Sequence, residues 1–296
     1  MSGVVSPFLV HSAVQAITPL LLAALAGSLC AQAGVFNIAL EGQMLVGAFA
    51  AVAGSFHFAG AAAGVACGAA AAMLFALILA YGSTVLRGDA IVIGIGMNLL
   101  ASGLTAYLLR EVFGVSGTFD DPRIVGLPAL RIAAFDRVPF AAALFSGQTA
   151  LTWLAWALTA AIGVALFRTA PGLRLRGIGG QAAAAATLGV AVRRYQVAVV
   201  LGGGALCGLA GAQLALGTIT VFAEDMSAGR GWIAVVAVML GRNNPLLAAL
   251  ACVLFGFADA VGLRLQSLGM ASQLTDIAPY VVTLAALLLG RRTRLA

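Results

Sequence analysis

Residues 60–86 read GAAAGVACGAAAAMLFALILAYGSTVL, an apolar stretch without a single charge. A helix needs about 20 such residues to cross the roughly 30 Å hydrocarbon core of a bilayer. The stretch therefore predicts a membrane-spanning helix. Its glycines Gly60, Gly64 and Gly68 recur every four residues, as do Gly204 and Gly208 later in the chain. In lipid, this spacing lets helix backbones approach closely.

The composition of the whole chain agrees with that stretch. Of 296 residues, 62% are hydrophobic and 9% charged, and the mean hydropathy is +1.07. Soluble domains carry about 25% charged residues, so this chain cannot cover a water-facing surface. We therefore predict an all-α polytopic membrane protein, forming one transmembrane domain over residues 1–296.

About nine membrane helices are expected, within a range of eight to ten. The apolar stretches lie near residues 12–33, 38–58, 60–86, 90–111, 149–168, 195–216, 229–242, 245–265 and 275–290. The first is interpreted as a retained span, because it lacks the positively charged start of a signal peptide.

Arginine positions predict the orientation. Ten of the sixteen arginines fall on one side of this arrangement, which is then cytoplasmic by the positive-inside rule. Nine spans place the C-terminus inside and the N-terminus outside. Residues 112–148 become a long outer loop, and residues 169–194 a cytoplasmic loop.

Two segments do not fit a plain spanning helix. Residues 33–43 read AGVFNIALEGQ, polar and marked by glycine between two apolar stretches, and residues 228–241 read AGRGWIAVVAVMLG, too short for a comfortable span. Both begin with Ala-Gly. Interrupted helices in matching halves are typical of transporters built from repeats, so an internal repeat of two halves is possible.

The polar residues of the first segment are candidates for a substrate pathway. An ionised carboxylate at mid-bilayer costs about 3 kcal/mol on insertion scales, which makes Glu41 expensive if it faces the membrane interior. In one interpretation Asn37, Glu41 and Gln43 line a polar pathway or gate. In the other, which we favour slightly, Asn37 caps a helix and Glu41 meets that helix's amides or an arginine.

Two further amides stand in apolar surroundings. Asn98 lies in the uncharged stretch IGIGMNLL, where it can bind a sugar or base, or equally a neighbouring helix. Gln213, near the outer end of the sixth span, has the same two interpretations.

The cytoplasmic loop contains a second kind of candidate. Gln181 to Leu188 is rich in strong helix formers and is followed by Gly189, a usual helix stop. A short helix between arginine-bearing segments suits docking of a partner. The alternative is a helix lying on the lipid headgroups, which its polyalanine composition makes less favourable.

Some chemistries are excluded by the residues present. The chain contains no lysine, so it has no Walker A lysine to reach nucleotide phosphates and cannot be a P-loop ATPase. Its cysteines and histidines show no metal-ligand spacing, and no catalytic constellation falls within the spans. We expect no catalytic residue, metal or cofactor, and hence a transport subunit rather than an enzyme.

At this point the motifs resemble a known family. GVFNIALEGQM at residues 34–44 resembles the hallmark of permease subunits of bacterial ABC importers for nucleosides, simple sugars and branched-chain amino acids. GLRLRGI at 172–178, AGRGWIA at 228–234 and LGRNNP at 240–245 match the same family in order. FGFADA at 255–260 is most similar to the shorter permease of nucleoside systems. The chain departs from the family at 179–181, where Gly-Gly-Gln replaces an acidic residue, Asn and Pro.

The resemblance implies a multi-pass subunit of the bacterial plasma (inner) membrane. Its expected partners are cytoplasmic ATP-binding subunits, a second homologous permease and an extracytoplasmic substrate-binding protein, with no nucleic acid. Nucleosides are the expected cargo. Residues of the cytoplasmic loop would couple to the ATPase: Arg174, Arg176, Gln181, Ala184, Thr187, Leu188 and Gly189.

Two alternatives remain at this stage. In the first, the chain is a stand-alone secondary transporter or facilitator for a small polar solute, with Glu41 as the one plausible ion-coupling group in the spans. Otherwise it is an ABC permease for simple sugars or branched-chain amino acids.

Overall fold

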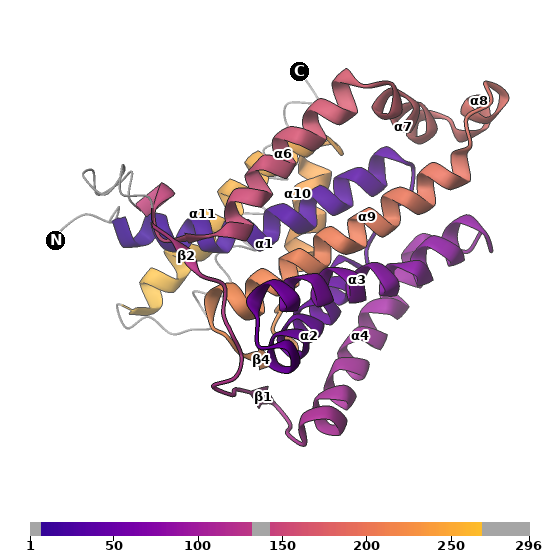
Figure 1. Ribbon diagram of the computed structural model, residues 1–296. Coiled ribbons are helices and arrows are strands. Elements are labelled where there is room, and N and C mark those ends of the chain that lie inside the picture. The colour runs from indigo at the N-terminus through magenta and orange to yellow at the C-terminus, as the bar shows by residue number, and fades with distance from the viewer. Residues whose placement is uncertain (1–6, 132–142, 268–296) are drawn as a thin grey trace.

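The computed structural model describes residues 7–131 and 143–267 (Figure 1). Long helices run roughly side by side, and a helix overlaps each of the stretches predicted as spans up to residue 267. The span expected at 275–290 lies outside the described residues. The helices are α1 (Pro7–Gln32), α2 (Leu40–Phe58), α3 (Ala61–Thr84), α4 (Ala90–Phe113), α6 (Ala150–Arg168), α7 (Ala170–Gly180), α8 (Ala182–Thr187), α9 (Val192–Ala212), η1 (Gln213–Thr218), α10 (Arg230–Leu240) and α11 (Pro245–Ser267).

Six of the described helices are long and apolar enough to cross a membrane: α1, α3, α4, α6, α9 with η1, and α11. α2 stands outside that set, and its polar first turn holds Glu41 and Gln43. α10, with 11 residues, is about 16 Å long and crosses only part of the hydrocarbon, as the sequence indicated. The chain is thus an all-α, multi-pass membrane protein with interrupted helices.

The centre of the described bundle is held by α1 and α2. α1 packs along α9, α10 and α11, and α2 along α3 and α9. The contact of α2, α3 and α9 is made by backbone against backbone. A Cβ on Gly47 would lie 2.5 Å from the Cα of Gly208, and one on Gly68 would lie 2.7 Å from the carbonyl oxygen of Gly47. The predicted role of glycine spacing in packing is confirmed for Gly64, Gly68, Gly204 and Gly208, whereas Gly60 lies at the helix start in open surroundings.

Most arginines of the described chain gather at one end of the bundle, which we call the arginine-rich end. α7 and α8 project from this end (Figure 1). At the opposite end, two short antiparallel ladders join the loops: β1 (Thr118–Phe119) pairs with β4 (Phe222–Ala223), and β2 (Ala129–Leu130) pairs with β3 (Gln148–Thr149).

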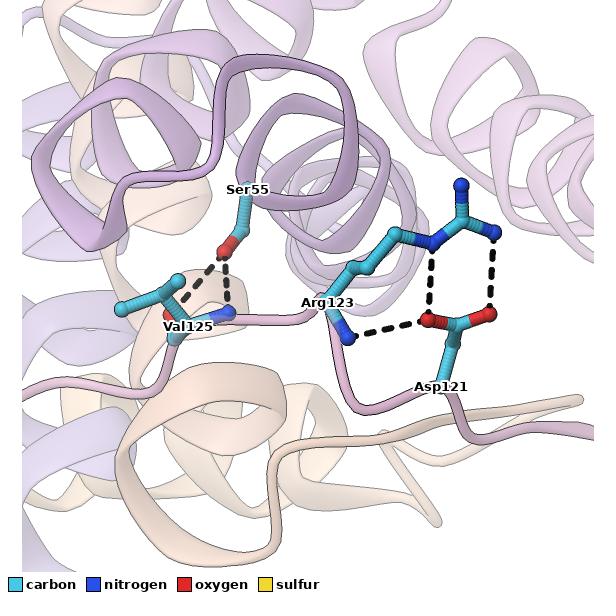
Figure 2. A network of polar contacts seen from close by, with 4 residues as sticks. All are labelled: Ser55, Asp121, Arg123 and Val125. Atoms are coloured by element: carbon cyan, nitrogen blue, oxygen red, sulfur yellow. Dashed lines mark hydrogen bonds and ion pairs between the residues drawn. The ribbon is translucent and has the colours of Figure 1, made fainter.

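The loop after α4 is fastened to the end of α2 (Figure 2). The Val125 amide donates to Ser55 Oγ, and Ser55 Oγ donates to the Val125 carbonyl, both at 2.9 Å. Arg123 binds Asp121 at 3.0 Å and lies 4.1 Å above the ring of Phe56. The described part of the expected outer loop is therefore ordered against the helix ends.

Candidate functional site

The break between α1 and α2 carries the first group of predicted site residues. Asn37 Oδ1 accepts a hydrogen bond from the Ala39 amide at 3.0 Å, and Asn37 Nδ2 donates to Gln43 Oε1 at 3.3 Å. Both side chains are buried. The expectation that Asn37 caps α2 is wrong: Ala39 is the N-cap residue, without a side-chain bond. Asn37 lies two residues too early and closes a local turn instead.

Asn98 supplies the cap that Asn37 does not. Its Oδ1 accepts from the Gly42 amide at 2.8 Å, and its Nδ2 donates to the Ile38 carbonyl at 3.1 Å. Both halves of its amide therefore bind the backbone at the start of α2. α4 approaches closely here, since a Cβ on Gly94 would lie 3.2 Å from the Ala39 nitrogen.

Glu41 fastens this junction to α10. Its carboxylate accepts from the Gly229 amide at 2.8 Å and from the Gly231 amide at 2.6 Å. The first amides of a helix lack partners within the helix, and the helix dipole favours negative charge there. The structure thus gives Glu41 the geometry of a pin, although the amides belong to α10 rather than to α2. A Cβ on Gly231 would lie 2.4 Å from the Glu41 nitrogen, so glycine is required for this approach.

Gln213 lies apart from this group. It begins the π-helical turn η1 at the far end of α9, and its Oε1 accepts from Thr149 Oγ1 at 2.7 Å. The structure therefore brings together Asn37, Glu41, Gln43 and Asn98 at one junction and leaves Gln213 in another environment.

The predicted docking helix exists as α8, with Gln181 and Leu188 as its flanking caps. The Gly189 amide donates to the Ala186 carbonyl and the Val190 amide to the Ala185 carbonyl, at 3.0 and 3.2 Å. With Gly189 at φ +79°, this is a Schellman stop, as the sequence predicted. At the start of α8, Gln181 makes no capping bond.

The surface of α8 is open. Leu188 is 84% exposed, Gln181 and Ala184 are exposed, and Thr187 bonds only to the Ala184 carbonyl, at 2.8 Å. Behind it, Arg174 donates to Tyr195 Oη at 3.4 Å, and the Arg176 guanidinium lies 5.1 Å from the Phe167 ring centre. These contacts hold α7 against the bundle and leave α8 projecting.

α7 also contacts the α1–α2 break. A Cβ on Gly179 would lie 2.3 Å from the Gln32 carbonyl oxygen, and Gly34 lies against the same glycine. Gln196 Nε2 donates to the Ala33 carbonyl at 3.1 Å, and Gln32 Nε2 donates to the Asn243 carbonyl at 2.7 Å. One continuous set of contacts therefore runs from the projecting loop to the junction that holds Glu41.

Sequence reasoning missed one polar contact, which lies near the middle of α4. Ser102 Oγ donates to Asp225 Oδ1 at 2.8 Å, and Asp225 is exposed. The sequence feature that could have indicated this contact is the acidic pair at 224–225, between two apolar stretches. Within residues 7–131 and 143–267, no group of three or more His, Cys, Asp or Glu side chains is placed to hold a metal ion.

Comparisons with known proteins place this geometry in context. Residues 9–287 match the family described as the permease component of branched-chain amino acid transport systems. The chain is 32% identical to the guanosine ABC transporter permease protein NupQ of Bacillus subtilis, covering 97% of this chain and 91% of that protein. It is 33% identical to the nucleoside ABC transporter permease protein NupC of Lactococcus lactis, covering 93% and 90%.

A third relative comes from an archaeon. The chain is 34% identical to a protein of Haloferax volcanii provisionally named as a glucose ABC transporter permease, TsgC13, covering 89% of this chain and 79% of that protein. No solved structure matches the chain.

Proposed function

Because this chain belongs to the family of permease components of branched-chain amino acid transport systems, we propose that it is the nucleoside-conducting membrane subunit of an ABC importer. One observation carries the choice of cargo: similarity to a guanosine permease and to a nucleoside permease extends over more than nine-tenths of the chain. A transport component of this family works with ATP-binding subunits and a substrate-binding protein.

The absence of lysine supports a complex in which this chain conducts the solute and another subunit hydrolyses ATP. Without a Walker A lysine this chain cannot hydrolyse ATP by a P-loop, so transport driven by ATP needs another subunit to hydrolyse it. We propose that α8 receives it. Its exposed Leu188 and alanines present a small apolar surface at the arginine-rich end, which faces the cytoplasm under the positive-inside rule.

The proposed partner at α8 is the ATP-binding subunit, and a second homologous permease completes the transmembrane unit in the bacterial plasma membrane. Movement of α8 reaches α7 directly, and α7 touches the α1–α2 break through Gly179 and Gly34. Binding of ATP can shift the conformation only if the ATPase binds α8 with different affinity in the two states.

The function is tested by purifying the chain in mild detergent with its ATPase, second permease and binding protein, and reconstituting the complex in proteoliposomes. ATP-dependent uptake of tritiated guanosine, exceeding that of glucose and leucine, is the expected result. Glucose is the second candidate cargo, favoured by the similarity to the Haloferax protein. Uptake of glucose alone would show that the cargo is glucose rather than a nucleoside. Uptake without any ATPase would overturn the importer assignment.

The docking of α8 is tested separately. Leu188→Asp and Ala184→Arg place charge on the exposed face of α8, so we expect loss of ATPase co-purification and of uptake while membrane insertion persists. Leu130→Asp, an exposed leucine at the opposite end, is the matched control and must retain the ATPase. Normal ATPase binding in both α8 variants would refute the docking proposal.

A further inference from the structure

The contact between Ser102 and Asp225 lies near the middle of α4, one of the helices long and apolar enough to cross a membrane. Ser102 follows the start of α4 at Ala90 by 12 residues and precedes Arg110 by eight. At 1.5 Å per residue these separations are about 18 and 12 Å. The serine hydroxyl that binds Asp225 at 2.8 Å therefore lies deep between the charged ends of α4, and the Asp225 carboxylate lies at the same depth.

An exposed carboxylate at this depth has few possible surroundings. Lipid chains offer no hydrogen bond, and acidic side chains within membrane spans face a bundle interior, a partner or a water-filled cavity. Asp225 is exposed, so it does not face the interior of this subunit. Its Oδ1 accepts from Ser102, which leaves the acceptor capacity of Oδ2 for a group outside the subunit.

The backbone around Asp225 turns sharply through left-handed residues. Asp225 has φ +53° and Ala228 has φ +47°, although neither is a glycine. Aspartate adopts this left-handed conformation readily, whereas alanine does so rarely and needs surrounding structure to hold it. Here the holding structure is the β1–β4 ladder on one side and the start of α10 on the other. The segment precedes the short helix α10, and transporters build substrate sites beside such interrupted helices.

We propose that Asp225 and Ser102 form a binding station for the hydroxyl groups of the passing solute. This inference rests on the proposed function, and it names the residues that contact the cargo. A carboxylate accepts hydrogen bonds from the adjacent hydroxyls of a ribose or a hexose without needing a counter-charge. The same charge repels phosphate groups, so the station admits nucleosides and rejects nucleotides.

The station is tested in the reconstituted complex with two probes, tritiated guanosine and tritiated 2′,3′-dideoxyguanosine. A hydrogen bond to a charged group is worth about a tenfold factor or more in affinity. We expect wild-type protein to prefer guanosine by about tenfold, and Asp225→Asn to reduce that preference to within about twofold. Ser102→Ala should weaken the preference less, because the carboxylate remains. Asp120→Asn, an exposed aspartate of the loop, is the matched control.

An unchanged preference in Asp225→Asn would overturn the proposal. A complex that moves glucose but no nucleoside would refute the proposed cargo, and the same variants would then be assayed with glucose and deoxyglucose. Loss of discrimination with that pair supports the station, and retained discrimination refutes it.

A second measurement does not depend on the cargo. In a chain whose four cysteines are replaced by alanine, Asp225→Cys is treated with a charged, membrane-impermeant thiol reagent. Leu100→Cys is the control, since Leu100 lies two residues before Ser102, is exposed and points about 200° away around α4. We expect at least tenfold faster labelling at position 225. Equal rates would show that this face holds no water-filled path and would overturn the proposal.

Discussion

The carboxylates of Glu41 and Asp225 both lie within the length of the apolar helices, yet the protein uses their oxygens differently. Glu41 is partly buried and gives each oxygen to a backbone amide of α10. Asp225 is exposed and gives one oxygen to Ser102. The cost of a charge in a membrane is the same physical term for both. The difference is whether groups of the protein bind both carboxylate oxygens, as in Glu41, or only one, as in Asp225. The first arrangement is structural, and the second leaves an oxygen for a candidate ligand.

The largest effect is expected from removing Glu41, the carboxylate with a structural role. Glu41→Ala leaves the Gly229 and Gly231 amides without their acceptor, which should lower the free energy of unfolding by about 3 kcal/mol. Chemical unfolding in detergent micelles measures the change. Glu111→Ala, an exposed glutamate at the end of α4, is the control and should change little. Equal stability of the two variants would mean that the Glu41 bonds contribute nothing.

A second change adds a carboxylate acceptor to the start of α8, a helix start that has none. Gln181 is the N-cap of α8 with extended backbone and no capping bond. Gln181→Asp supplies an acceptor for the first amides, so we expect α8 to gain about 1 kcal/mol. Hydrogen exchange of the α8 amides should slow about fivefold. Exchange at an unchanged rate would show that the cap does not form.

A smaller effect is expected from the other carboxylate. Asp225→Asn keeps the shape and an acceptor for Ser102, so the free energy of unfolding should change by less than about 0.5 kcal/mol. The same variant should lose its preference for hydroxylated cargo. A stability loss as large as that of Glu41→Ala would make Asp225 a second structural pin and erase the contrast.

The smallest effect concerns Asp121, a partly exposed carboxylate in the loop after α4. Hydrogen bonds from the Arg123 side chain, and then from its backbone, hold the pKa of Asp121 below its usual value. The stabilisation is therefore present above the unfolded pKa and is lost as pH falls through the lowered folded pKa. Comparing wild type with Asp121→Asn between pH 7 and pH 3, the difference in melting temperature should shrink on acidification. A difference that grows would contradict the sign.

Much of the fold follows from the sequence because uninterrupted apolar stretches leave a membrane helix little choice. The short α10 and the stop at Gly189 were predicted from length and from a helix-ending glycine. Glu41 was identified as costly, and Asn98 as a helix-binding or ligand-binding amide, from local surroundings alone.

What the sequence could not give were the long-range partners. Glu41 binds amides 188 and 190 positions away, and Ser102 binds Asp225 across 123 positions. No local pattern encodes such distances. The cap of α2 was misassigned for the same reason, because the nearby Asn37 was the visible candidate and the actual acceptor, Asn98 Oδ1 on α4, was remote.

The contact of Gly47, Gly68 and Gly208 has a mechanical consequence. Where side chains separate two helices, small changes of rotamer can absorb a displacement of one helix. Where the backbones are in direct contact, no side chain can adjust in this way. α2, α3 and α9 should therefore move as one stiff body during a transport cycle, and a displacement at their arginine-rich end arrives undiminished at the other. We therefore expect the bending of the molecule to fall outside this three-helix body.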